Sequence, residues 1–221
     1  MLERRADQVQ LAFIAAMGLA GLWVLLRLPP GALVPIHFDA NGTPNGWAEP
    51  AMGVFLMPAL AAMSWGLQAL LSKIDPRGHN LVRSAGAVDT IFTAVTVLLA
   101  ALQALIVSAA SGALAPPSSL GLVLVGGLLM VIGNVMGKLR TNYTVGIRTP
   151  WTLADERVWD QTHRFGGKAF VLAGALLCVL AALPLNPSWQ GLAIVVVAVV
   201  SAGAVTLKSY LLWRALQRPS G

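Results

Sequence analysis

Residues 90–110 read TIFTAVTVLLAALQALIVSAA, a run without a single charged side chain. A helix that crosses a membrane needs about 20 mostly apolar residues, and this run supplies them. Five further stretches are long and apolar enough to be assigned in the same way. The six predicted spans are residues 9–28, 51–71, 90–110, 120–136, 169–185 and 191–213. The sequence therefore predicts an all-α fold, a polytopic bundle of six transmembrane helices.

Composition and charge support this class and set the orientation. Of 221 residues, 57% are hydrophobic and 11% are charged, whereas a soluble domain carries about 25% charged residues. If six spans alternate, every Lys and Arg except Arg27 falls on one side of the membrane. Basic loops stay in the cytoplasm, so we expect both termini there. The net charge of +6 is thus explained by cytoplasmic loops, and no direct nucleic-acid partner is expected.

The spans themselves favour binding over catalysis or driven transport. None carries a charged residue at its centre, where ion-coupled transporters place ionisable groups. Metalloprotease, nucleophile-elbow and phosphate-loop motifs are absent from the sequence. The lone Cys178 offers neither a disulfide nor a cysteine-based metal site, and no cofactor is expected. The first apolar stretch exceeds a signal-peptide core and lacks a clean cleavage site, which predicts an uncleaved first helix.

The chain is predicted to have two halves, each with one long loop. Residues 1–112 contain the outer loop 28–50, and residues 113–221 contain the cytoplasmic loop 133–167. Each half has three spans, so the halves would have inverted topology, as in an internal repeat. In the outer loop several prolines forbid a helix, and two Asn-Gly pairs indicate turns. Residues 34–38 are expected to form a short strand. The candidate binding residues there are His37, Asp39, Gly42 and Trp47.

The outer loop allows two interpretations. His37 and Asp39 would share one face of the strand, and with Glu49 they give three possible metal donors. Their spacing matches no closed metal motif. A hydrogen-bonded turn with an interfacial Trp47 explains the same residues, so no metal site is assigned.

The cytoplasmic loop concentrates hydrogen-bonding side chains. Its candidate binding residues are Asn134, Lys138, Asn142, Tyr143, Arg148, Pro150, Trp151, Thr152, Trp159 and His163. We expect a helix that starts near Pro150 with Thr152 as its N-cap, and that stops at Gly166-Gly167 before the fifth span. An amphipathic helix on the membrane surface explains the stretch without chemistry. Arg148 could equally clamp a carboxylate or phosphate, or contact anionic lipid headgroups.

At these two loops the sequence resembles the SdpI family of bacterial membrane proteins. The outer segment Pro35-Ile36-His37-Phe38-Asp39, with Gly42, Pro44, Gly46 and Trp47, looks like the family's N-terminal domain of unknown function. The cytoplasmic segment looks like its defining motif, with Gly133-Asn134, Lys138, Asn142-Tyr143, Gly146–Thr152, Trp159, Thr162-His163 and Gly166.

The resemblance implies a multi-pass protein of the bacterial inner membrane that gives immunity to a secreted peptide toxin and transmits a signal. Its implied partners are membrane lipids, a peptide toxin on the outer face and a cytoplasmic repressor protein. The alternative is a membrane enzyme or facilitator that acts on a lipid or anionic small molecule at the cytoplasmic face. In that alternative Asn134, Arg148 and His163 would converge on one pocket.

Overall fold

The computed structural model describes residues 2–39, 41–113, 117 and 119–217. The regular elements of the described chain are helices and one two-stranded antiparallel sheet. In chain order the elements are α1 (Leu2–Leu25), β1 (Val34–Phe38), β2 (Pro44–Ala48), α2 (Pro50–Ile74), α3 (Gly78–Arg83), α4 (Ala85–Ala110), α5 (Leu120–Met136), α6 (Pro150–Ala154), α7 (Glu156–Ala181) and α8 (Pro187–Leu216).

The long helices confirm a helical membrane protein. Five of them, α1, α2, α4, α7 and α8, have the length and apolar composition to cross a membrane. The helix α5 is also apolar, but its 17 residues are at the short end of the range for a span. Its bounds are those of the predicted fourth span.

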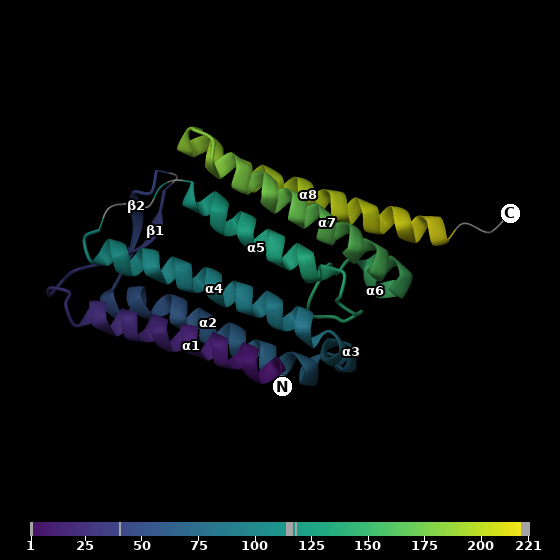
Figure 1. The fold of residues 1–221 in the computed structure, drawn as a ribbon, viewed down its shortest axis with the longest axis horizontal. Coiled ribbons are helices and arrows are strands. Elements are labelled where there is room, and N and C mark those ends of the chain that lie inside the picture. The colour runs from purple at the N-terminus through teal and green to yellow at the C-terminus, as the bar shows by residue number, and fades with distance from the viewer. Residues whose placement is uncertain (1, 40, 114–116, 118, 218–221) are drawn as a thin grey trace.

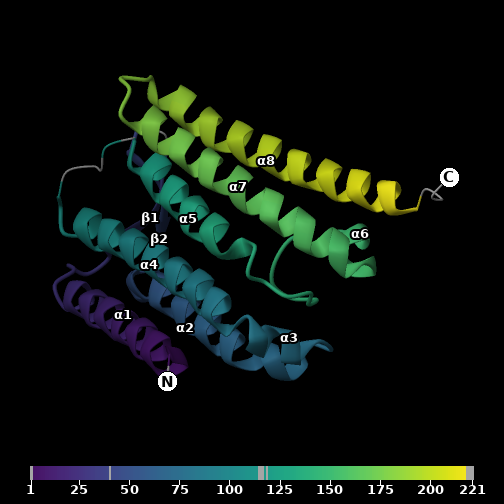
Figure 2. The same ribbon diagram turned by 45° about the vertical axis from the view of Figure 1, so that its right-hand side comes forward.

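The six longest described helices pack in two groups of three (Figures 1 and 2). Helices α1, α2 and α4 contact one another, and so do α5, α7 and α8. Among the described helices, only α4 and α5 pack against each other across the two groups. The start of α1 and the end of α8 lie at one end of the molecule, with α3 and α6, and the β1–β2 hairpin lies at the other (Figure 1). We call these the inner end and the outer end.

A cluster of buried apolar side chains lies at each end of the first group. At the outer end Val34 of β1 packs with Val24, Val54 and Ile106, which fixes the hairpin on the helices. At the inner end Trp159 joins a cluster of Leu71, Leu81, Ala87, Val88, Val135 and Leu139. The inner cluster therefore joins side chains of both helix groups.

The expected stop at Gly166-Gly167 is wrong, because α7 continues through both glycines to Ala181. These glycines serve close packing. A Cβ on Gly167 would lie 2.6 Å from the backbone oxygen of Gly133 in α5, and a Cβ on Gly133 would lie 2.6 Å from that of Gly167. Residues 169–181 of the predicted fifth span and the predicted separate amphipathic helix are therefore parts of one helix. Its exposed polar residues in the first turns include Glu156, Arg157, Asp160, Gln161 and Arg164.

The expected N-cap at Thr152 is also wrong. Proline disfavours a helical conformation in the residue before it, so Thr149 is extended and caps α6 while Pro150 takes the first helical position. Thr152 is the third residue of that helix and completes a capping box with Thr149. The extended Asp155 then ends α6 and caps α7, where its side chain accepts a hydrogen bond from the Arg157 N–H.

Candidate functional site

The outer hairpin is built on an Asp39 turn. The Asp39 Oδ1 accepts hydrogen bonds from the N–H groups of Asn41 (2.8 Å) and Thr43 (2.9 Å). Gly42 completes the turn with a φ of 80°, a conformation that favours glycine. Since these hydrogen bonds stabilise the carboxylate, they lower the pKa of Asp39, that of Thr43 most strongly. Asp39 is thus ionised at neutral pH.

The other two expected residues of the hairpin are exposed. His37 lies in β1 and its Nδ1 shares a hydrogen bond with the Asn45 side chain. Trp47 of β2 pairs with Pro35 and exposes 54% of its surface, as a residue at a membrane interface can. Asp39 follows the strand rather than lying in it, so it does not share a strand face with His37 as expected. Within the described residues, no His, Cys, Asp or Glu side chains form a group of three that could hold a metal ion.

A cavity of about 500 Å³ lies between the hairpin and the helices at the outer end. Its lining comes from the hairpin, from α2 and α4 of the first group, and from α5 and α8 of the second. His37, Asp39 and Gly42 are among the residues that line it. The hairpin thus forms part of a binding-sized hollow between the two helix groups.

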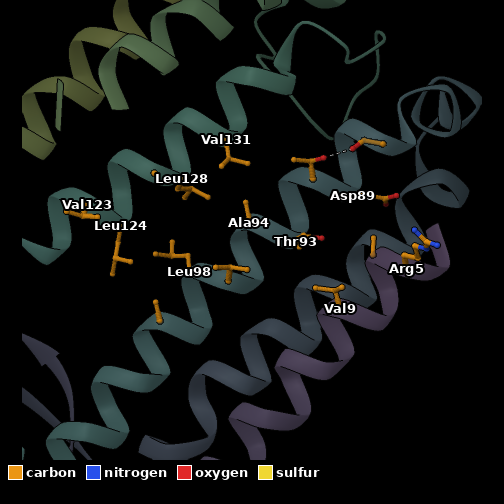
Figure 3. Close-up of a pocket in the computed structure, with 16 residues that line it drawn as sticks. Arg5, Val9, Asp89, Thr93, Ala94, Leu98, Val123, Leu124, Leu128 and Val131 are labelled. Atoms are coloured by element: carbon orange, nitrogen blue, oxygen red, sulfur yellow. Dashed lines mark hydrogen bonds between the residues drawn. The ribbon is translucent and has the colours of Figure 1, made fainter. Parts of the chain in front are cut away.

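A second cavity of about 670 Å³ lies between α1 and α4 on one side and α5 on the other. Figure 3 shows its apolar side chains along the helices, with Arg5 and Asp89 at the inner end. Asp89 accepts a hydrogen bond from the Gln68 amide (2.7 Å). Both cavities lie where the two helix groups face each other.

At the inner end, Asn142 shapes the loop between α5 and α6. Its side chain is fully buried, and its amide donates to the carbonyl oxygens of Arg140 (2.8 Å) and Val145 (2.9 Å). Its Oδ1 accepts from the N–H groups of Thr144 (2.9 Å) and Val145 (2.6 Å). The side chain is therefore occupied within the loop and fixes the loop's conformation.

The first helix group clamps this loop from the other side. Asp75, after α2, accepts hydrogen bonds from the Tyr143 N–H and the Thr144 hydroxyl, both at 2.9 Å. Asn80 of α3 donates to the Thr141 carbonyl (2.8 Å), and the Ser84 hydroxyl accepts from the Arg140 N–H (2.8 Å). Asp75, Asn80 and Ser84 are all buried. None of these three residues was predicted as a site residue, because a polar residue after a span signals no partner about 60 residues further along the chain.

The loop rests on α7 through two buried aromatic rings. Trp159 and His163 stack with ring centroids 3.9 Å apart. The Trp159 indole donates to the Leu139 carbonyl (2.8 Å), and His163 Nε2 accepts from the Ile147 N–H (2.9 Å). Gly146 has a φ of 123°, and a Cβ there would lie 2.5 Å from His163 Nε2. The close approach requires glycine at this position.

Hydroxyl groups tie α6 to α8. Thr149 donates from its hydroxyl to Ser209 (3.0 Å), and the buried Thr152 donates to the Ile147 carbonyl (2.8 Å). Trp151 is half-buried and packs on Tyr210 with ring centroids 5.2 Å apart.

The side chain of Arg157 forms a hydrogen bond and salt bridge with Asp155, which lowers the pKa of that carboxyl to about 2.

The remaining expected residues are exposed: Asn134, Lys138, Tyr143, Arg148 and Pro150. The Arg148 guanidinium donates to the Tyr143 carbonyl (3.0 Å), and Arg77 lies over the Tyr143 ring with 5.1 Å to its centroid. Arg148 thus faces solvent while His163 is buried with both ring nitrogens hydrogen bonded. Among the three residues that the enzyme alternative requires, Asn134 and Arg148 are exposed whereas His163 is buried, so their side chains lie in different environments.

The helices and the two polar ends define a polytopic helical membrane protein. Residues 138–209 match the SdpI/YfhL protein family, and residues 12–62 match a domain of unknown function, DUF1648. The chain is also 45% identical over 56 residues to a protein of Bacillus subtilis (strain 168) described as "Immunity protein SdpI". The matched stretch covers 25% of this chain and 27% of that relative, about a quarter of each. Together these matches support a multi-pass bacterial membrane protein of the SdpI family. No solved structure matches the chain.

Proposed function

We propose that this chain is a non-enzymatic immunity and signal-transduction protein of the bacterial inner membrane. The observation that carries the proposal is the 45% identical stretch shared with a protein described as an immunity protein. The structure supports it with a hairpin and cavity at the outer end and a hydrogen-bonded loop at the inner end.

The proposal includes six spans, with α5 as the fourth, and both termini in the cytoplasm. The alternating direction of α1, α2, α4, α5, α7 and α8 supports this topology (Figure 1), as does the placement of the basic residues. It also treats residues 1–112 and 113–221 as the two functional halves, which correspond to the two packed helix groups.

The expected binding residues take two kinds of role in this proposal. At the outer end His37, Asp39, Gly42 and Trp47 form the surface that meets a peptide toxin. At the inner end the exposed Lys138, Tyr143 and Arg148 contact a cytoplasmic protein, such as a repressor held at the membrane. The buried Asn142, Thr152, Trp159 and His163 are positioning residues, because their polar atoms bind within the loop and its supporting helices.

Signal transfer needs two arrangements of the bundle with different affinities for the two partners. The outer cavity lies between the helix groups, and the inner loop of the second group is bound by Asp75, Asn80 and Ser84 of the first. A change in the angle between the groups would therefore alter both ends.

A survival assay tests the function. A sensitive bacterium would express the intact chain, His37→Ala or Arg148→Ala at equal membrane levels, and would be exposed to purified secreted peptide toxins. We expect the intact chain to protect, His37→Ala to weaken protection, and Arg148→Ala to keep protection but weaken capture of a cytoplasmic partner. Absence of protection by the intact chain against every toxin would contradict the proposal.

A further inference from the structure

The outer cavity has an unusual polar feature in its wall. Gln190, in the first turns of α8, lines the cavity and is 5% exposed. Its amide nitrogen donates to the Leu185 carbonyl (3.2 Å), which fixes the orientation of the amide. Its Oε1 is buried and accepts no hydrogen bond from the described residues. A buried acceptor without a partner is unfavourable, so a ligand N–H that donates to it would offset that penalty.

A second acceptor lies on the hairpin side of the same cavity. Asp39 uses its Oδ1 for the two turn hydrogen bonds, whereas the contact of its Oδ2 with the described residues is a long one of 3.5 Å to the Asn41 amide. This oxygen retains capacity for a ligand. Asp39 is also the one charged residue of the described lining, apart from the titratable His37, and no Lys or Arg lines the cavity.

The remaining lining is largely apolar. It includes Ile36 and Phe38 of the hairpin, Met57 of α2, Ile106 of α4, Leu124 of α5 and Ile194 of α8. An apolar hollow with a carboxylate at one side and a buried amide oxygen at another is complementary to an apolar chain that carries N–H donors and one positive charge.

We propose that this cavity binds an apolar peptide segment with one lysine, whose ammonium pairs with Asp39 while a peptide N–H donates to Gln190 Oε1. The inference rests on the proposed function and specifies its ligand. A lipid acyl chain fits the apolar walls but offers no donor to Gln190. Because the hairpin and α8 belong to different helix groups, the bound segment contacts both groups at once.

Binding to the intact protein in lipid nanodiscs tests this site. The probes are a synthetic Leu/Ala peptide with one central lysine and the same peptide with that lysine acetylated, both carrying a fluorophore for anisotropy. We expect the lysine peptide to bind about tenfold more tightly, the effect of one charge-assisted hydrogen bond. Asp39→Asn keeps the turn acceptor and should abolish the difference, whereas Gln190→Leu should weaken binding of both peptides.

Glu49→Gln is the matched control, since it removes one exposed carboxylate at the outer end without changing a lining residue. It should leave the tenfold difference unchanged. Equal binding of the two peptides by the intact protein, no binding, or loss of the difference in Glu49→Gln would overturn the inference. So would native mass spectrometry that finds a phospholipid lost specifically in Gln190→Leu. The survival assay separates the two proposals. If Asp39→Asn and Gln190→Leu still protect the cells, only the proposed binding site is rejected. If the intact protein binds the lysine peptide selectively but gives no protection, only the immunity function is rejected.

Discussion

At the scale of single residues, Asp75 joins the two helix groups. Its carboxylate accepts hydrogen bonds from the Arg77 N–H (2.7 Å), the Tyr143 N–H and the Thr144 hydroxyl. The residue is 6% exposed, so its partners have little access to water. A buried donor left without an acceptor costs free energy comparable to a lost hydrogen bond. The inner loop is thus held by a side chain far from it in sequence.

We predict that Asp75→Ala loosens this loop and lowers the free energy of unfolding by at least about 2 kcal/mol, because it leaves several donors without their acceptor. Hydrogen exchange of the 140–147 segment should become faster than in the intact protein. Asp160→Ala removes an exposed carboxylate from α7 and serves as the control. Unchanged exchange in Asp75→Ala would show that the clamp does not hold the loop.

At the scale of elements, the start of α7 depends on an ionised cap. The pKa of Asp155 is lowered to about 2, mainly by its hydrogen bond with the Arg157 side chain. A carboxylate whose pKa is lower in the folded state stabilises the fold above its unfolded pKa, which is about 3.9. That stabilisation is lost as the pH falls from about 4 towards 2.

Asp155→Asn keeps a side-chain cap for the Arg157 N–H but removes the charge. We expect the intact protein to unfold at a higher temperature than this variant at pH 6, and the two melting temperatures to converge as the pH falls towards 2. Thermal unfolding in detergent across this pH range measures the effect. Asp160→Asn is the control, because it removes a carboxylate that caps no helix. If its melting temperature converged with that of the intact protein by the same amount, the assignment to Asp155 would be contradicted.

The contact between α5 and α7 depends on glycines. A Cβ at Gly133 would lie 2.6 Å from the Gly167 oxygen and 2.9 Å from the Val171 nitrogen, both backbone atoms. We predict that Gly133→Ala separates the two helices and costs about 1–3 kcal/mol, the usual range for overpacking. Gly127→Ala, in the same helix, meets no atom within 4 Å and should be neutral or slightly stabilising. Equal melting temperatures for the two variants would contradict this packing.

Sequence patterns predicted elements better than contacts between them. Apolar length gave the bounds of α5 and the C-terminal end of α4, and turn residues predicted a strand over β1. The prediction that the helix stops at Gly166-Gly167 failed. A helix tolerates glycines at positions where the neighbouring helix lies so close that a Cβ would not fit. The role of Asp75 was not predictable either, since it depends on which distant backbone atoms the fold brings near. That of Gln190 depends on the cavity that the hairpin and the helices form beside it.

At the scale of the whole molecule, two helix groups meet along α4 and α5, with a cavity at the outer end and a clamped loop at the inner end. The proposed immunity and signal-transduction function requires these two ends to lie on opposite sides of the membrane. That arrangement in turn requires the short helix α5 to cross it. The topology is therefore the claim on which both proposals depend.

Labelling with a membrane-impermeant maleimide tests it most directly. In a Cys178→Ser background, Thr43→Cys places a thiol on the exposed hairpin turn, and Gln161→Cys places one on the exposed inner part of α7. We predict that Thr43→Cys reacts in intact cells and that Gln161→Cys reacts only after the membrane is permeabilised. Equal labelling of both thiols in intact cells would place the two ends on one side and contradict the six-span receptor.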